Sequence, residues 1–299
     1  MKKFIYSAVL SLGLLFASCD YVSSPYPEKN ANITSDTLSC DASFPVVSTH
    51  IKKILIEDYT GHTCPNCPRA ARAITTIDTT HPGKIIALGV HVGGFAVPNS
   101  TFTADYRTTV GNTYDAFFGA SAFGLPEGMF SRKRFDAVNN THLFFYTNFP
   151  TYFSTIQNEP SVVDLQLNLN YDPSTRKICC AVRDSFLTAV TGTYKLVMLI
   201  SQDSIIDWQD DVDALPQTVQ YYVHRHVLRD AVTPAGAWGE PLIGNNAAAG
   251  LTQVRHFAYN IPAAYNNIPC DVTKCHIVAF IYNTSTYEII QAEEAKVTQ

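Results

Sequence analysis

The segment that most constrains the fold runs from Ile54 to Ile77 and reads ILIEDYTGHTCPNCPRAARAITTI. It opens with a short apolar run of the length expected for a buried strand. A polar break follows, and then a C-x-x-C motif formed by Cys64 and Cys67. Beyond Pro68 the apolar residues recur at i, i+3, i+4 and i+7, which places them on one face of a helix. The segment therefore predicts a strand, a tight loop that carries two cysteines, and a helix.

This order of elements resembles the redox centre of thioredoxins. Asp58 adds to the resemblance, because it stands six residues before Cys64, where thioredoxins carry a buried carboxylate. At a helix N-terminus the thiolate of Cys64 would be stabilised, so we expect Cys64 to react first and Cys67 to be the shielded resolving thiol. Asp58 would then accept the proton of Cys67. Two other interpretations stay open: a structural disulfide, or half of a zinc site that would need a second close pair of ligands.

A second apolar run, from Lys84 to Val92, follows the helix. Strand, helix and strand of these lengths predict a right-handed βαβ unit with parallel strands. Thioredoxin-like folds also carry a cis-proline before the strand that follows their intervening helix. Pro126 occupies the corresponding place in chain order, so we expect it to be cis and to face the C-x-x-C motif. Residues 50–158 are therefore expected to form an α/β thioredoxin-like domain.

The hydrophobic pattern changes to a period of two after Pro160. Apolar and polar residues alternate from Val163 to Leu169, a turn follows, and the pattern predicts a β-hairpin. Further strands are expected over 194–201, 221–228, 254–261, 276–282 and 287–292. Short strands separated by turns predict an all-β antiparallel sandwich domain over residues 159–299. Within it, Cys270 and Cys275 are close enough in sequence to form a local disulfide.

The N-terminus predicts export. Two lysines precede an apolar stretch over 4–16, which is shorter than the roughly 20 residues that span a bilayer. Small residues before Cys19 resemble the bacterial lipobox, so residues 1–18 are expected to be a lipoprotein signal peptide and Cys19 the lipidated attachment to a membrane. An ordinary signal peptide with a chance cysteine is the alternative. Residues 19–49 are rich in Ser, Thr, Asn and Pro and are expected to be a tether.

Charge and cysteine content narrow the class of function. A net charge of -5 without a basic block argues against a nucleic-acid partner, and eight cysteines favour an oxidising compartment. His224 and His226 alternate on a predicted strand, and several aspartates crowd residues 207–213, but neither spacing matches a metal motif. A polar strand face and a solvated acidic loop are the favoured interpretations, so no metal and no cofactor is expected. The sequence carries no hydrolase or kinase motif.

Three stretches together resemble the outer-membrane-protein-28-related lipoproteins of Bacteroidota: ILIEDYTGHTCPNCPRAA, YYVHRHVLRD followed by WGE, and IVAFIYNTSTYEIIQAEEAKV. The resemblance implies a lipid-anchored location at the outer membrane, on its periplasmic or cell-surface side, and a thioredoxin-like domain followed by a β-rich domain. It does not assign an activity. Two functions therefore stand side by side: thiol–disulfide exchange with the thiols or disulfides of exported proteins, or a non-enzymatic surface adhesion or scaffold role in which the C-x-x-C is a structural disulfide.

Overall fold

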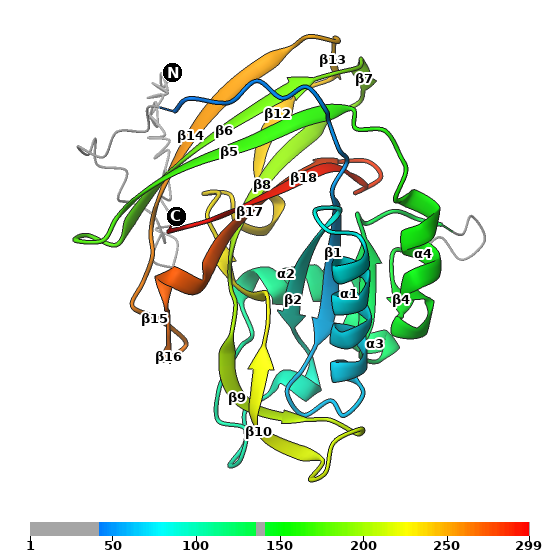
Figure 1. Cartoon of the computed structure of the whole chain (residues 1–299), viewed down its shortest axis with the longest axis vertical. Helices are drawn as coiled ribbons and strands as arrows, with labels where there is room; N and C mark the ends of the chain where they lie inside the picture. The colour runs from blue at the N-terminus through cyan, green and yellow to red at the C-terminus, as the bar shows by residue number, and fades with distance from the viewer. Residues whose placement is uncertain (1–41, 136–140, 299) are drawn as a thin grey trace, which may run out of the picture. The chain divides into compact units, whose positions relative to one another are not determined.

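A computed structural model of the chain describes residues 42–135 and 141–298 (Figure 1). The expected signal peptide, Cys19 and most of the expected tether lie outside the described residues.

The predicted βαβ unit is confirmed. Strands β1 (Ile54–Thr60) and β2 (Ile85–His91) are parallel, with a register that runs from Ile54 opposite Ile85 to Thr60 opposite His91. Helix α1 (Cys67–Thr80) connects them. Nearly every residue of both strands is buried, as is typical of parallel strands that are covered on both faces.

Among the described residues, β1 and β2 are central strands of a nine-stranded sheet in the order β18-β17-β8-β11-β2-β1-β3-β4, with β12 paired to β8. Strand β11 joins β2 in parallel through Val227 and Gly89. A side chain at Gly89 would place its Cβ 3.2 Å from the backbone oxygen of Arg225, so glycine permits this close approach. The remaining strands of the sheet are β3 (Glu127–Phe130), β4 (Phe144–Phe145), β8 (Tyr194–Gln202), β11 (Val227–Ala231), β12 (Glu240–Ile243), β17 (Cys275–Asn283) and β18 (Ile289–Lys296).

The expected fold class, an α/β thioredoxin-like domain followed by an all-β sandwich domain, is wrong. The chain is mostly β, and strands from both halves share the large sheet. All described residues fall into one compact unit. The reason is that β8 and β17 are apolar along nearly their whole length, and both are buried on both faces. Strands of this kind are stable when other elements pack on both of their faces and a hydrogen-bonded strand lies at each edge. Strand β11 supplies such a neighbour for β8 and connects it through β2 to the first half of the chain.

A separate three-stranded sheet has the order β14-β6-β5. It contains the predicted hairpin, now β5 (Val163–Asp172) and β6 (Lys177–Phe186), together with β14 (Thr252–Asn260). The strand expected over 221–228 is divided in two, because His226 has a positive φ of 52° and turns the chain. The other elements are α2 (Thr109–Phe118), α3 (Ala120–Phe123), α4 (Phe149–Ile156), β7 (Val190–Thr191), β9 (Ile205–Asp210), β10 (Thr218–His224), β13 (Asn246–Ala247), β15 (Ala264–Tyr265) and β16 (Ile268–Pro269), and the 3-10 turns η1 (Gly94–Ala96), η2 (Tyr146–Asn148), η3 (Gly236–Trp238) and η4 (Val272–Lys274).

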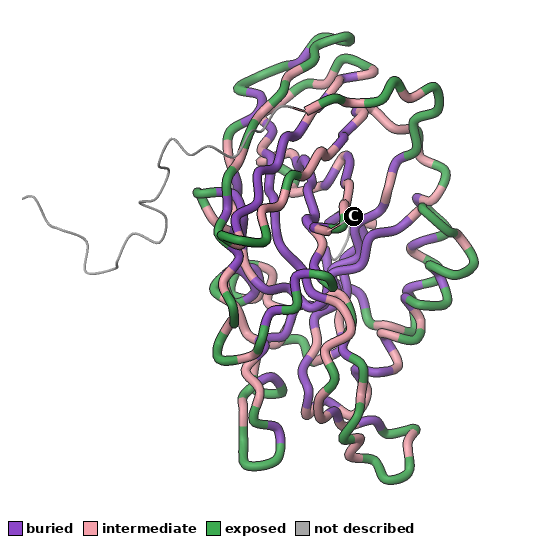
Figure 2. Tube along the Cα trace, turned by 60° about the vertical axis from the view of Figure 1, so that its left-hand side comes forward, coloured by how far each residue is buried: buried purple, intermediate pink, exposed green. Residues whose placement is uncertain are grey.

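The two faces of the large sheet are covered by different elements. Along β1, Leu55 and Tyr59 point to the face that α2 covers, whereas Ile54 and Ile56 point to the face under α1 and α4. On the same side as α1, the three-stranded sheet packs over β8 and β17. Figure 2 shows that the buried residues lie mostly along the inner stretches of the chain and the exposed residues mostly at its periphery. Within the described part of the chain, no helix is long and apolar enough to cross a membrane.

Candidate functional site

Cys64 and Cys67 form a disulfide with their Cα atoms 5.4 Å apart, which confirms that they pair. The amide of Cys64 donates to the Gly61 carbonyl, and the amide of Cys67 donates to the Cys64 carbonyl, so two successive turns lead into α1. The helix begins at Cys67 with Pro68 in its first turn, a position where the missing N–H of proline costs no hydrogen bond.

Both cysteines are buried, with exposed fractions of 1% for Cys64 and 2% for Cys67. The sequence had led us to expect that Cys64 would react first and that Cys67 would be shielded. The exposed fractions show instead that Cys64 is no more accessible than Cys67. One of the two segments that bury the disulfide is the segment around Phe95. Its carbonyl accepts from the Thr63 amide, and a Cβ at Gly61 would lie 2.5 Å from the backbone carbon of Phe95. Only a glycine at position 61 leaves room for this approach.

The second segment that buries the disulfide is the hairpin formed by β9 and β10. Its turn runs along the disulfide loop: the Asp210 amide donates to the His62 carbonyl at 2.8 Å, and the Val212 amide donates to the Pro65 carbonyl at 2.9 Å. The side-chain amide of Gln209 donates to the Cys64 carbonyl at 3.1 Å. These contacts join positions about 145 residues apart in the chain. They close one side of the disulfide.

Ion pairs hold the same hairpin turn to α1. Asp213 accepts from Arg69 at 2.6 Å and 2.9 Å and also pairs with Arg72, and Asp211 accepts from Arg72 at 2.7 Å. The aspartates that the sequence suggested as a solvated acidic loop are thus partners of helix α1. Arg69 and Arg72 are three residues apart on one helix face, which was the only sequence feature that could have indicated this role.

Asp58 lies on the α1 side of β1, since side chains alternate along a strand and Ile54 and Ile56 point the same way. Its side chain is 7% exposed, and within the described residues its Oδ1 atom has no hydrogen-bond partner. Burial raises the pKa of Asp58 to about 7. A carboxyl that titrates near neutral pH can give or take a proton under physiological conditions.

The Leu125–Pro126 peptide bond is cis, as the sequence analysis predicted. Pro126 directly precedes β3, which pairs antiparallel with β1 through Glu127 opposite Tyr59 and Gly128 opposite Asp58. The proline thus lies beside the end of β1 that leads into the cysteine loop.

A cluster of buried aromatic and imidazole rings was missed by the sequence analysis. His91 and His224 lie 5.7 Å apart by ring centroid, and Tyr106 contacts both at 4.9 Å and 5.0 Å. His62 stacks on Phe102 beside them. Burial lowers the pKa of His224 to about 4 and that of His91 well below 6.5, so these rings are neutral. The interpretation of His224 as part of a polar strand face is wrong. In the described ranges, no group of three or more His, Cys, Asp or Glu residues is placed to hold a metal ion.

Cys270 and Cys275 do not form the expected disulfide. Both are buried free thiols, and their Sγ atoms are 3.6 Å apart, well beyond a bond of about 2.05 Å. The Sγ of Cys275 also lies 3.3 Å from the carbonyl oxygen of Asp271, to which it can donate. The hydrogen bond from Cys275 lowers the pKa of Cys270 to about 7, with Arg176 and Arg229 adding to the effect.

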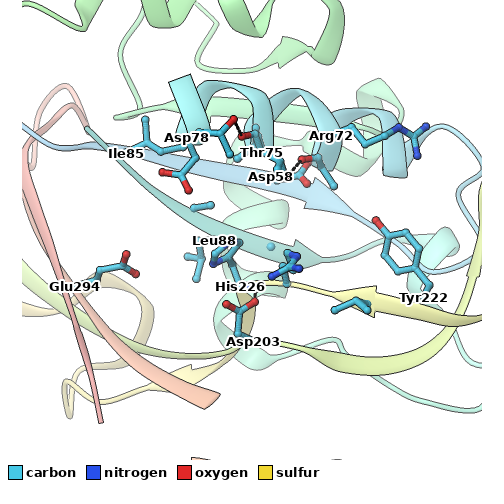
Figure 3. Close-up of a pocket in the computed structure, with 17 residues that line it drawn as sticks. Asp58, Arg72, Thr75, Asp78, Ile85, Leu88, Asp203, Tyr222, His226 and Glu294 are labelled. Carbon is cyan, nitrogen blue, oxygen red and sulfur yellow. Dashed lines mark hydrogen bonds between the residues drawn. The ribbon is translucent and has the colours of Figure 1, made fainter. Parts of the chain in front are cut away.

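A cavity of about 620 Å³ opens beside α1 (Figure 3). Its walls come from α1, from β1 and β2, and from the chain around β10 and His226. Asp58 lines it, so the buried carboxyl lies between the helix that carries the disulfide and an open space. The volume is within the range of about 300–1,000 Å³ that is typical of small-ligand sites.

Comparison with known proteins identifies one family. The model of the family described as outer membrane protein Omp28 matches residues 111–299. No curated protein matches the chain.

Similar solved structures share little sequence with this chain. HBP35 of Porphyromonas gingivalis is 13% identical, with a TM-score of 0.58 over 84% of this chain and 77% of that one. A protein from Agrobacterium tumefaciens is also 13% identical, with a TM-score of 0.48 over 84% and 97%. A domain of the outer membrane lipoprotein Omp28 from Porphyromonas gingivalis is 18% identical, with a TM-score of 0.32 over 46% and 88%. The first of these likenesses concerns the fold alone.

Proposed function

The chain belongs to the Omp28 family of outer membrane proteins, and from that premise we propose that it exchanges disulfides with the thiols of other exported proteins through Cys64 and Cys67. The observation that carries the proposal is the combination of a C-x-x-C disulfide at the start of α1 with a buried, unpartnered carboxyl on the strand beneath that helix. A purely structural disulfide does not require a carboxyl group that can exchange a proton nearby. A disulfide that opens and closes needs a nearby group that exchanges a proton.

The reaction begins with attack of a client thiolate on the Sγ of Cys64. A mixed disulfide forms between the client and Cys64, and the bond between Cys64 and Cys67 breaks. Cys67 leaves as a thiolate and takes a proton from Asp58, whose pKa of about 7 leaves it partly protonated at neutral pH. A second client thiolate then attacks the client sulfur of the mixed disulfide, the bond between the client and Cys64 breaks, and Cys64 leaves as a thiolate that takes a proton from solvent. The client is oxidised by two electrons, and the Cys64–Cys67 pair is reduced to two thiols; the reverse sequence reduces a client disulfide.

Access to the sulfurs requires the turn of the β9–β10 hairpin to move. Its attachments are a few backbone hydrogen bonds and the ion pairs of Asp211 and Asp213, which are partly solvent-exposed. Exposed ion pairs contribute only about 0–1 kcal/mol each, so such a turn can open without unfolding the sheet. Leu215 at the tip is fully exposed, which gives a client an apolar contact beside the disulfide.

The test measures whether the pair equilibrates with glutathione buffers and traps clients. We expect a reduction potential above about -300 mV, where structural disulfides resist reduction. Cys67→Ser should accumulate mixed disulfides through Cys64, whereas Cys64→Ser should accumulate none. Asp213→Asn should speed reduction by loosening the hairpin turn, and Asp105→Asn, which removes an ion pair with Arg107 elsewhere, serves as the matched control.

The second candidate function is a surface binding or scaffold protein in which the disulfide is only structural. The burial of both sulfurs favours it. A pair that stays oxidised in every glutathione buffer, together with no trapped partner in Cys67→Ser, would end the proposal of exchange and leave this alternative.

A further inference from the structure

The cavity beside α1 lies between two elements that pack on the same face of the large sheet, namely helix α1 and the three-stranded sheet. Helix α1 covers the sheet around β1 and β2, and the three-stranded sheet covers β8 and β17 on the same side. Between them the cavity is lined by apolar side chains of α1 and β2, among them Ile74, Ile85 and Ala87. This gives the cavity a floor suited to a short hydrocarbon chain.

The polar lining of the cavity is predominantly acidic. Carboxylates reach it from four separate elements: Asp58 from β1, Asp78 from α1, Asp203 from the end of β8, and Glu294 from β18. Figure 3 shows Asp58 and Asp78 beneath the helix and Asp203 and Glu294 across the opening from them. Burial raises the pKa of Glu294 to about 7; the positive charge of Lys53 opposes this increase, and the negative charges of Glu293, Asp78 and Asp203 add to it. The lining therefore favours a positive charge.

The basic residues of the lining do not cancel this charge. Arg72 is already paired with Asp211 and Asp213 of the hairpin. Burial lowers the pKa of His226, so its ring is neutral. Arg225 is the remaining arginine of the lining, against four carboxylates.

Asp58 supplies an independent indication of a ligand. It is more than nine-tenths buried, it lines the cavity, and its Oδ1 has no partner in the described part of the chain. A buried acceptor without a partner costs about 1–3 kcal/mol. Because Asp58 lines the cavity, a donor that enters it can approach this carboxyl group.

We propose that this cavity binds an organic cation, namely a primary ammonium group on an alkyl chain. An ammonium has three donors on a compact charge, which suits carboxylates that converge from different elements, and its methylene stem suits the apolar floor. Tyr222 lines the cavity as well and offers an aromatic ring to the cation. The cavity shares Asp58 with the proposed exchange centre, but its lining contains neither cysteine, so amine binding can be tested while the disulfide stays closed.

The ammonium could belong to a free amine or to a lysine side chain of a polypeptide. Calorimetric titration at about pH 8 with cadaverine, and separately with an acetylated and amidated Gly-Lys-Gly peptide, distinguishes the two. Binding of either probe supports the site and identifies its source, and binding of neither overturns the proposal. The same peptide with its lysine acetylated should not bind, because it lacks the charge. The oxidised protein is used throughout, so the outcome does not depend on thiol chemistry.

Two variants locate the binding. Asp58→Asn should weaken it by about tenfold or more, the loss expected when a charged hydrogen bond is removed. Thr75→Trp should fill the cavity and abolish binding, because Thr75 is an exposed helix residue that lines it. Thr76→Trp is the matched control, since Thr76 is exposed on the same helix but does not line the cavity. Binding that survives Thr75→Trp, with melting temperatures unchanged, would place the amine elsewhere and overturn the proposal.

Discussion

Arg132 and Glu57 form a fully buried ion pair, with the Nε and Nη2 atoms of the arginine 2.7 Å and 2.6 Å from the two carboxylate oxygens. The guanidinium also lies 4.3 Å from the ring centroid of Tyr114 and 5.0 Å from that of Phe280. Glu57 is the neighbour of Asp58 on β1, and the two acids point to opposite faces of the sheet. Glu57 is neutralised by a fixed partner, whereas Asp58 lines the cavity.

Arg132→Met should destabilise the protein by about 3–5 kcal/mol, because it leaves Glu57 charged and unpaired in the core. Urea unfolding measures the loss. The double variant Glu57→Gln with Arg132→Met should recover part of it, since an amide is less costly to bury than a carboxylate. Lys53→Met, which removes the partly exposed pair with Glu293, is the control and should cost under about 1 kcal/mol. A double variant no more stable than Arg132→Met would contradict the expectation.

Asp58→Asn should stabilise the protein at high pH and not at low pH. The folded protein keeps the Asp58 proton up to about pH 7, whereas the unfolded chain loses it near pH 3.8. The carboxyl therefore contributes its full stability below about pH 4 and loses that contribution as the pH rises toward 7. Asparagine at position 58 does not titrate, so the variant does not lose this stability as the pH rises. Unfolding free energies measured from about pH 4 to pH 8 should show the difference between variant and parent growing across this window; a flat difference would show that Asp58 titrates normally.

His91→Phe should make the protein more resistant to acid. Burial, and then the neighbouring His224, lower the pKa of His91 well below 6.5, so the folded state stays neutral while the unfolded chain gains a proton. Stability from this group is full above about pH 6.5 and is lost as the pH falls below it. Neither ring nitrogen of His91 has a partner in the described residues, so phenylalanine removes no hydrogen bond.

His224→Phe is the comparison for that experiment. The Nε2 atom of His224 donates to the Trp208 carbonyl at 3.2 Å, so this variant should lose stability even at about pH 7. Thermal melting of both variants at about pH 7 and about pH 5 separates the two effects. Equal acid sensitivity of His91→Phe and the parent would argue against a neutral buried ring.

The sequence was sufficient for the elements around the cysteines, because they are encoded by local periodicity. The helical spacing of the apolar residues after Pro68 predicted α1, and the two apolar runs predicted β1 and β2. What the periodicity does not contain is which strands pair. The contact of Gly89 with Val227 joins the two halves of the sheet, and it depends on one glycine and on packing between distant segments. The expected fold class was wrong for this reason.

The candidate site was likewise only half predictable. Cys64, Cys67 and Asp58 lie within ten residues and belong to one motif. Gln209, Asp211 and Asp213 cover that motif from about 140 residues away, and in sequence they look like an ordinary acidic loop. Their role follows from the ion pairs with α1, which only the folded structure reveals.

Cys19→Ser should release the protein from the membrane. Small residues precede Cys19 as in a lipobox, and acyl chains on that cysteine would be the attachment. Intact-mass measurement of the membrane-extracted parent should find a lipid-sized addition on a peptide that starts at Cys19. The variant should appear in the soluble fraction. An unmodified Cys19 in the mature parent protein would remove this expectation.

Cys270 and Cys275 should close into a disulfide under mild oxidation. Their Sγ atoms are 3.6 Å apart, and the lowered pKa of Cys270, about 7, provides a thiolate at neutral pH. Treatment with diamide should therefore remove two titratable thiols and leave Cys180, which is buried and whose pKa is raised to about 12 by burial. Cys275→Ser should keep Cys270 reactive toward alkylating reagents, whereas Cys180→Ser should leave the oxidation unchanged. Peptide mapping that finds Cys270 and Cys275 still reduced after oxidation would contradict the expectation.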